Sequence, residues 1–588
     1  MLPNEQWDLT DIYADEAAWE ADVVRIQELS QNVASLCGKL SNEQCLCDAL
    51  LADTALSELI EKVYGYAHMR HDLDHTDAVA QAMRDKALGA YYAASEATAF
   101  LMPEISSLPS DVLLALPEKY PQLAEYAHML EDVVRNRPYI LSEREEQLLT
   151  MASPALSAMD SAFSMLESSE LHKGEIIDEN GEKLTLTDGT FAQCRESRDR
   201  RVRADAFRVF HESFASMGNT IAALYAGQVR ADVFRARARG FDSCLQKALF
   251  SDNLPESLYT GLIDAVHACL PVHHRYLELR RKALGVEKLH LYDCYVPLVS
   301  EMDDISYTYE QAKEKVQAYL KPLGETYSED LKRLLAGGWV DVYEKPGKAT
   351  GAYATGVYGV HPYMLLNFMG KLNDVFTLAH EAGHCMHTYY SDMQTYVNKD
   401  YPIFLAEIAS TVNENLLLRG MLSETEDPKM RAYLINHFID ELRGTVIRQT
   451  MFAEFEWKVH TLAEEGKPLT AEVFCGVYHD LLVQYFGDNV EIDPYMDWEW
   501  ARIPHFYRAF YVFKYATGFS AAAAISQQIL GSGKTTPYLA FLGAGGSDYP
   551  LEILKKAGVD LTTPQPVTAA LNEFDQKIKE LEKLLEVL

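Results

Sequence analysis

The stretch Asp374-Val-Phe-Thr-Leu-Ala-His-Glu-Ala-Gly-His-Cys-Met-His-Thr388 decides how this chain is organised. It lacks proline, and its apolar residues recur at the three- and four-residue spacing of a buried helix. His380 and His384 stand four positions apart, so both imidazoles lie on one helix face and can bind the same zinc ion. Glu381 lies beside this pair and can take a proton from a water on the metal. The stretch therefore predicts one edge of a zinc site.

A zinc site that performs hydrolysis needs a third protein ligand and one open position for water. A second helix-like run, Phe404-Leu-Ala-Glu-Ile-Ala-Ser-Thr-Val-Asn-Glu-Asn415, follows the first. Its Glu407 can complete a His, His, Glu set. Glu414 lies two turns further along the same helix face, where it can orient a ligand histidine by a hydrogen bond.

With these two runs, the sequence resembles the oligopeptidase F branch of the thimet-oligopeptidase family of zinc peptidases. The resemblance extends to three further stretches, which are Trp7-Asp-Leu-Thr-Asp-Ile-Tyr13, Gly347-Lys-Ala-Thr-Gly-Ala-Tyr353 and Arg502-Ile-Pro-His-Phe-Tyr507. It therefore covers nearly the whole chain, and the paired zinc motifs are highly specific to this family.

The resemblance implies the roles of the central residues. One zinc ion is expected on His380, His384 and Glu407, with Glu381 as the general base. The family also implies a mainly α fold of two helical lobes that enclose a deep channel, and short peptides as substrates.

Aromatic residues downstream are candidates for stabilising the reaction. Tyr507, Tyr511 and Tyr515 repeat every fourth residue, so they are predicted to line one helix face. Such a stripe is more often part of a core, but beside a zinc site phenol and imidazole groups can donate to an oxyanion. The resemblance implies catalytic roles for His505 and Tyr507, and it leaves open which of Tyr511 and Tyr515 contacts the substrate.

A β signal precedes the zinc motif. The segment from Trp339 to Phe368 contains short apolar runs separated by Gly and Pro, which predicts a small sheet beside the site. An exposed edge strand can hydrogen-bond the backbone of an extended peptide. The resemblance supports this role for segment 351–356, with Gly351, Tyr353 and Gly356 as substrate-binding residues. A tight turn with ordinary glycines is the alternative.

Two regions outside the motif complete the organisation. Residues 15 to about 136 read as successive amphipathic helices, and alternation around Asn180-Gly181 predicts a β-hairpin. We place a boundary there, between an N-terminal helical lobe (1–190) and a catalytic domain (191–588).

A histidine cluster in the N-terminal region has a simpler interpretation. His68, His71 and His75 stand near Asp72 and Asp74, which gives several metal-binding side chains in one segment. Their spacing matches no familiar zinc motif, so we predict a solvated polar helix face.

Composition restricts the partners and the compartment. The 588 residues carry 53 Lys and Arg against 87 Asp and Glu, a formal net charge of −34, which disfavours nucleic acid as a partner. We find no signal-peptide pattern and no apolar run of about 18 residues, so no membrane span is expected. Nine cysteines without framework spacing indicate reduced thiols and a cytoplasmic protein.

Together these features predict a zinc-dependent oligoendopeptidase that hydrolyses internal bonds of short peptides. A zinc carboxypeptidase or dipeptidase is an alternative that differs only in how the channel treats peptide ends. A catalytically silent metal-binding helical protein is a second alternative. The complete ligand and base set argues against it, since structural zinc usually has a protein ligand in its fourth position. The oligomeric state is not predicted.

Overall fold

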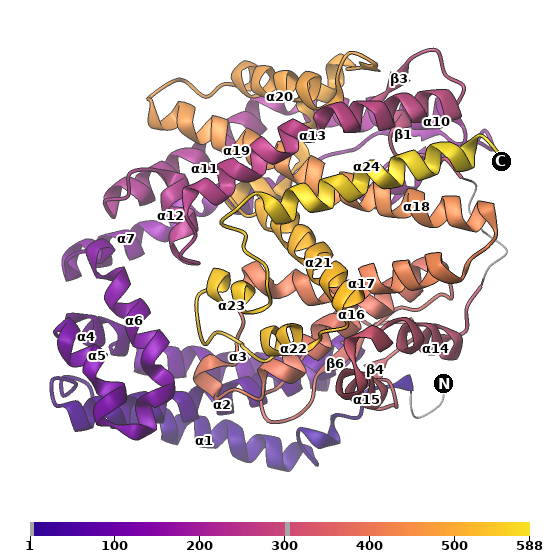
Figure 1. Ribbon diagram of the computed structural model, residues 1–588. Helices are drawn as coiled ribbons and strands as arrows, with labels where there is room; N and C mark the ends of the chain where they lie inside the picture. The colour runs from indigo at the N-terminus through magenta and orange to yellow at the C-terminus, as the bar shows by residue number, and fades with distance from the viewer. Residues whose placement is uncertain (1–4, 300–305) are drawn as a thin grey trace. The chain divides into compact units, whose positions relative to one another are not determined.

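Helices make up nearly all of the regular structure in the computed structural model, which describes residues 5–299 and 306–588 (Figure 1). Within these residues the strands are two or three residues long and form three small sheets. The predictions of a mainly α protein and of a small sheet before the zinc motif are confirmed.

The chain forms two compact units, each built from three segments. Unit 1 contains Met1–Pro138, Asp303–Gly420 and Ile525–Val559, and unit 2 contains Tyr139–Met302, Met421–Ala524 and Asp560–Leu588. Helices α17 (Ile403–Glu424) and α21 (Phe513–Ser532) contain two of the points where the chain passes from one unit to the other. The boundary near residue 190 divides the chain in a different way and stays a prediction.

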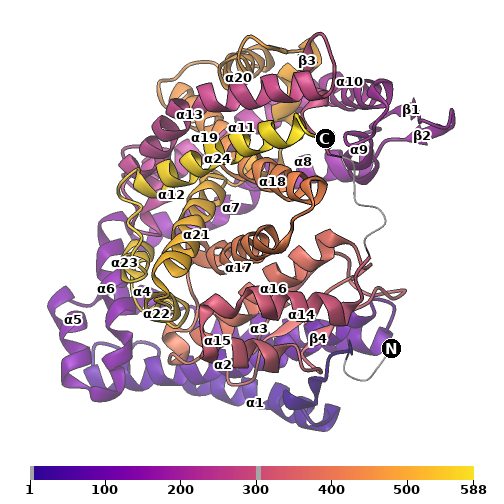
Figure 2. The same ribbon diagram turned by 45° about the vertical axis from the view of Figure 1, so that its right-hand side comes forward.

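Unit 1 begins with three long helices that lie side by side, α1 (Glu16–Ala34), α2 (Glu43–Leu73) and α3 (Ala78–Thr98) (Figure 2). Each follows a residue whose side chain accepts a hydrogen bond from the first turn, and these caps are Asp15, Asn42 and Asp77. The other helices within this unit are α4 (Leu101–Ser107), α5 (Ser110–Lys119), α6 (Ala127–Asn136), α14 (Tyr309–Tyr319), α15 (Glu325–Leu334), α16 (Leu372–Ser391), α22 (Thr536–Leu542) and α23 (Pro550–Lys556).

The N-terminal motif holds the small sheet of unit 1 in place. The sheet has the order β4 (Val340–Asp341), β6 (Tyr363–Leu365), β5 (Tyr353–Thr355). The indole of Trp7 contacts Tyr353 and Tyr363 edge-on, and its Nε1 donates a hydrogen bond to Met364 O at 2.8 Å. A buried aromatic side chain with its polar group satisfied is a strong anchor, so the start of the chain stabilises this sheet.

Unit 2 is also helical and carries the predicted hairpin. Strands β1 (Glu175–Ile177) and β2 (Lys183–Thr185) pair antiparallel, with Gly181 in the turn at φ +83°, so the hairpin prediction is confirmed. A parallel pair joins β3 (Leu289–His290) to β7 (Val490–Glu491). The α-helices of this unit are α7 (Glu143–Leu156), α8 (Ala158–Met165), α9 (Asp188–Cys194), α10 (Arg200–Ser216), α11 (Gly218–Ala238), α12 (Cys244–Phe250), α13 (Glu256–Ala283), α18 (Pro428–Leu442), α19 (Arg448–Glu464), α20 (Ala471–Phe486) and α24 (Gln565–Leu585).

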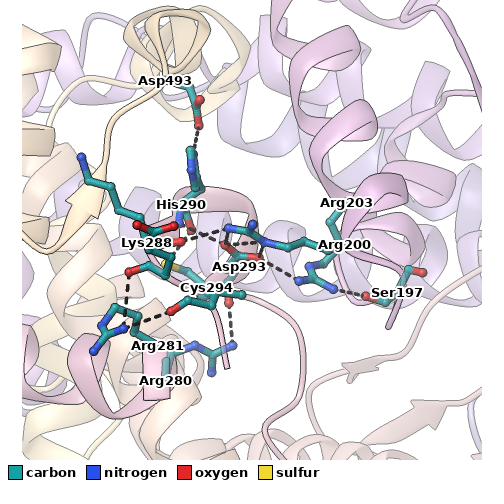
Figure 3. A network of polar contacts seen from close by, with 12 residues as sticks. Ser197, Arg200, Arg203, Arg280, Arg281, Lys288, His290, Asp293, Cys294 and Asp493 are labelled. Carbon is teal, nitrogen blue, oxygen red and sulfur yellow. Dashed lines mark hydrogen bonds and ion pairs between the residues drawn. The ribbon is translucent and has the colours of Figure 1, made fainter. Parts of the chain in front are cut away.

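A buried polar network organises the interior of unit 2 around Asp293 (Figure 3). Its fully buried carboxylate accepts hydrogen bonds from Arg203 at 2.7 Å and from Arg200 at 2.8 Å. Arg280, also fully buried, donates to the backbone oxygen of Asp293 at 2.9 Å. Because paired charges in an interior are costly to separate, this network ties α10 and α13 to the 3-10 helix after β3, Leu291–Asp293.

No single helix among the described residues combines the length and hydropathy that crossing a membrane requires. One pair, Ala78–Ser107 with Ser110–Lys119, meets those limits when taken together, and it is bent by 106°.

Candidate active site

The predicted motif helix is α16, which runs from Leu372 to Ser391. The carboxylate of Asp374 accepts hydrogen bonds from the backbone N–H groups of Lys371 and Met369 and so fixes the helix start. One face of the helix is fully buried, through Val375, Leu378, Ala379 and Ala382. This burial sets the rotation of the helix about its axis, and the two motif histidines stay partly exposed on another side.

Helix α17 approaches α16 at the glycine of the motif. A Cβ added to Gly383 would lie 2.5 Å from Ser410 Cα and 2.6 Å from Ala409 O, so no larger residue fits without movement of the backbone. Nearby, Asn413 Nδ2 donates a hydrogen bond to Ala379 O at 3.0 Å. These contacts hold the two helices together and place Glu407 of α17 opposite the histidines.

The three predicted ligands come together. His380 Nε2 and His384 Nε2 are 3.1 Å apart, and Glu407 Oε2 lies 3.5 Å from the first and 3.4 Å from the second. Tetrahedral zinc with bonds of about 2.0 to 2.2 Å has ligand atoms roughly 3.3 to 3.6 Å apart. The residues present therefore fit a zinc ion, with three protein ligands and one position left for water or substrate.

Glu414 lies behind the first histidine of the motif. Its Oε1 is 2.5 Å from His380 Nδ1, so it can hold a proton on Nδ1, while Nε2 would bind a metal after losing its own proton. Burial by itself lowers the pKa of His380, but the hydrogen bond and charge of Glu414 outweigh it and raise this pKa to about 9. A site with this much negative charge attracts a cation.

Glu381 has the environment of a general base. Its side chain is buried, and among the described residues its Oε2 has no hydrogen-bond partner. Burial raises the pKa of this carboxyl above its ordinary value. A carboxylate kept from water, with one free oxygen next to a metal position, can accept a proton at that oxygen.

The segment predicted to bind substrate forms the edge of the small sheet. In the described part of the chain, β5 pairs with β6 on one side, and its other side carries no strand. A Cβ at Gly356 would lie 3.0 Å from Thr388 Cγ2, so the end of β5 lies close against α16. Gly351 has φ +80°, a conformation that favours glycine. The structure thus provides an edge strand next to the motif helix.

The remaining candidates belong to unit 2, where three of them form an aromatic cluster. His505 Nε2 lies 3.5 Å from the hydroxyl of Tyr515, and the ring of Tyr511 stacks on His505 with centroids 6.2 Å apart. Tyr507 lies apart from this cluster. Its ring stacks on Phe163, and its buried hydroxyl has no hydrogen-bond partner in the described residues.

Comparison with known proteins identifies the family. The model described as "Peptidase family M3" matches residues 193–573, and the model described as "Oligopeptidase F" matches residues 104–172. The chain belongs to peptidase family M3. The resemblance drawn from the sequence is therefore confirmed, and this family M3 protein is a metallopeptidase of the oligoendopeptidase F type that hydrolyses oligopeptides.

Relatives of known sequence or structure match this M3 peptidase over nearly its whole length. It is 43% identical to oligopeptidase PepF of Bacillus subtilis, over 99% of this chain and 87% of that protein. It is 39% identical to group B oligopeptidase PepB of Streptococcus agalactiae, over 99% of this chain and 97% of that protein. The crystal structure of oligoendopeptidase-F from Enterococcus faecium superposes with a TM-score of 0.76 at 36% sequence identity. The match covers 97% of this chain and 100% of that chain.

One prediction about the M3 peptidase is wrong. Tyr507, Tyr511 and Tyr515 do not share a helix face, because Tyr507 ends a short 3-10 helix and α21 begins only at Phe513. Between them Phe510 adopts φ +57°, and its N–H donates a hydrogen bond to the buried Glu456 Oε1 at 3.0 Å. A turn at residues 509–510 therefore interrupts the chain between the two helices, which the four-residue spacing of tyrosines does not reveal.

The N-terminal histidine cluster also differs from prediction. Asp72 is buried, and its carboxylate accepts a hydrogen bond from the hydroxyl of Tyr353 at 2.5 Å. This part of α2 is therefore not a solvated face. The sequence contained no signal for this contact, because the two residues are 281 positions apart.

Proposed function

We propose that this M3 peptidase is an endopeptidase with one zinc ion held by His380, His384 and Glu407. The observation that carries the proposal is the triangle of ligand atoms, with sides of 3.1, 3.5 and 3.4 Å. A zinc ion at this position supplies a Lewis acid that polarises a carbonyl and acidifies water. Glu414 holds the proton of His380 Nδ1 and so keeps the ligand nitrogen correctly oriented.

Proton transfer is assigned to Glu381. Its free Oε2 accepts a proton from the attacking water and then passes it to the nitrogen of the leaving amine. The buried position of this carboxyl, which raises its pKa, suits it to both steps. The free carboxyl group thus acts as base and then as acid within one cycle.

Binding of the peptide is assigned to β5. Gly351, Tyr353 and Gly356 lie in or beside this edge strand, whose unpaired side can hydrogen-bond an extended backbone. Recognition through the backbone tolerates many side chains, which suits short peptides of varied sequence. Family likeness further supports a deep channel between helical lobes that admits short chains. Nine cysteines without framework spacing support a cytoplasmic location.

Oxyanion stabilisation is assigned to His505 and Tyr507, with Tyr511 and Tyr515 as further substrate contacts. Burial and the nearby Arg508 lower the pKa of His505, so at neutral pH the imidazole is uncharged and can donate from one nitrogen. Phenylalanine replacements at positions 507, 511 and 515, assayed separately, test these roles. A role in the transition state lowers kcat more than it raises KM.

The central test is Glu381→Gln with a quenched-fluorescence peptide and metal analysis of the same sample. We expect zinc content near that of the wild type and a fall in kcat of at least about a hundredfold, within the range of general-base contributions. Turnover near the wild-type rate with zinc still bound contradicts the assignment.

A peptide blocked at both ends tests the endopeptidase assignment against a carboxypeptidase or dipeptidase. We expect mass spectrometry to show internal cleavage of the blocked peptide at a rate similar to that of the free peptide. A carboxypeptidase or dipeptidase would leave the blocked peptide intact.

A further inference from the structure

We propose that the C-terminal end of α2 holds a second transition-metal site, formed by His71, Asp72 and His75. Ligand-capable atoms of these three residues lie within 4.8 Å of one another. His75 Nε2 lies 3.4 Å and His71 Nδ1 3.7 Å from Asp72 Oδ1. These separations are close to the roughly 3.3 to 3.6 Å between neighbouring ligand atoms of a tetrahedral zinc ion.

The proposed ligands are withdrawn from water and incompletely hydrogen-bonded. The side chains of His71 and Asp72 are 12% and 11% exposed. Nδ1 of His71 is buried without a hydrogen-bond partner among the described residues, and so is Nδ1 of the neighbouring His68. Buried polar atoms in native proteins almost always have partners. A bound cation would satisfy the lone pair that His71 otherwise leaves unused.

Local electrostatics favour a positive charge at this position. Helix α2 ends at Leu73, and the last carbonyl groups of a helix together form the negative end of its dipole. The Asp72 carboxylate adds a full negative charge there, and His68 Nε2 lies 3.6 Å from its second oxygen. Two imidazoles and one carboxylate form a donor set that suits Zn²⁺, Co²⁺ or Ni²⁺ better than Mg²⁺ or Ca²⁺.

One side chain must move slightly to complete the site. The rings of His71 and His75 are stacked with centroids 4.6 Å apart, so their lone pairs do not yet converge. The side chain of His75 is 48% exposed and can tilt towards a shared ion without displacing buried groups. It also provides the route by which an ion reaches Asp72 from solvent.

The site lies against the segment that leads into β5. The second oxygen of Asp72 accepts the hydrogen bond from Tyr353, and the backbone oxygen of Asp72 accepts one from Ala349 N at 2.9 Å. The N–H of His75 donates to Gly347 O at 2.7 Å. An ion on Asp72 Oδ1 would fix the carboxylate that holds Tyr353. Metal binding is therefore expected to stabilise segment 347–353.

Zinc titration of the full-length chain carrying His380→Ala and His384→Ala isolates this site from the catalytic one. After treatment with a chelator, calorimetric titration with zinc chloride is expected to show one equivalent bound. Hydrogen exchange of segment 347–353 is expected to slow when zinc is added. Adding His75→Gln, a change at an exposed position that leaves the fold intact, is expected to weaken zinc binding by at least about tenfold.

The exposed His172, outside the cluster, gives a matched control. His172→Ala in the same background is expected to leave the binding and the exchange unchanged. Circular dichroism confirms that each variant is folded. The proposal is overturned if the His380→Ala, His384→Ala chain binds no zinc, if His75→Gln binds it equally well, or if His172→Ala weakens binding as much as His75→Gln does.

Discussion

Gly383 of α16 lies so close to Ser410 of α17 that an added Cβ would be 2.5 Å from the Cα of Ser410. Real Cβ atoms essentially never approach other heavy atoms this closely. The two helices carry all three proposed zinc ligands, so the hydrogen atom at position 383 sets the distance between the histidines and Glu407. The glycine inside the motif thus has a geometric role separate from the chemistry of its neighbours.

Gly383→Ala is therefore expected to push α17 away from α16. Overpacking of this kind costs about 1–3 kcal/mol of unfolding free energy, and it should reduce the zinc bound per chain. Urea denaturation and metal analysis measure the two effects. Gly89 in α3 is a matched control because nothing lies within 4 Å of its added Cβ. Gly89→Ala should be neutral or stabilising. Equal results for the two variants would contradict the packing argument.

Glu414→Gln removes the carboxylate that accepts the proton of His380 Nδ1. Because such partners orient a ligand imidazole and increase its basicity, we expect zinc affinity to fall about 10- to 100-fold. Competition with a chromogenic chelator measures the affinity. Added zinc should restore much of the peptidase activity, since Glu381 is untouched. If zinc affinity is unchanged, Glu414 does not have this positioning role.

Asp392 makes the stability of unit 1 depend on pH. Burial raises the pKa of this carboxyl from 3.8 to about 7, with Lys399 opposing the shift and Glu61 adding to it. The folded state therefore binds more protons than the unfolded state between about pH 4 and pH 7, so this group lowers stability as pH rises through that window.

Asp392→Asn is expected to remove this penalty. The variant should be more stable than the wild type at pH 8, by roughly 1–4 kcal/mol, and the difference should shrink at pH 5. The loss of a negative charge at the C-terminal end of α16 acts in the same direction. Denaturation curves at the two pH values provide the comparison. A constant difference across pH would mean that Asp392 does not titrate in this range.

Glu456 is expected to hold the loop that carries His505 and Tyr511. Burial raises the pKa of its carboxyl well above the ordinary value, and its Oε1 accepts a hydrogen bond from Phe510 N. Glu456→Gln keeps an acceptor of the same shape and should behave like the wild type. Glu456→Leu leaves the buried N–H unpaired, at a cost of about 1–3 kcal/mol.

Kinetics on a quenched peptide separate the two variants at position 456. A lower kcat/KM for Glu456→Leu alone, with zinc content unchanged in both, supports a positioning role in the loop. The same kinetic constants for both variants would contradict the positioning role of Glu456.

Much of the site could be predicted from the sequence because its chemistry is local. His380, Glu381 and His384 lie within five residues of one helix, whose period alone puts both imidazoles on one face. Glu407 and Glu414 follow on the next helix with their own periodic spacing. The hairpin at Gly181 was equally predictable, because turn residues act over only a few positions.

Contacts between segments that are distant in the sequence could not be predicted in this way. The tyrosine spacing from 507 to 515 suggested a helix, but Glu456 accepts the hydrogen bond of Phe510 and the chain leaves the helical path there. The sequence predicted a solvated Asp72, but this residue is buried and its carboxylate accepts a hydrogen bond from the hydroxyl of Tyr353. In the first case a buried polar partner far along the chain decides the backbone path. In the second, Asp72 stays within α2 as its local sequence predicts, and the distant partner decides only its burial.

The sequence by itself determined the candidate metal ligands, because ligand type and helical period are properties of short segments. Only the tertiary structure decided how closely α17 approaches α16, which side of β5 stays free and where the histidines of α2 meet Asp72. Those features depend on side chains that come together from distant parts of the chain, and local sequence patterns do not predict such contacts.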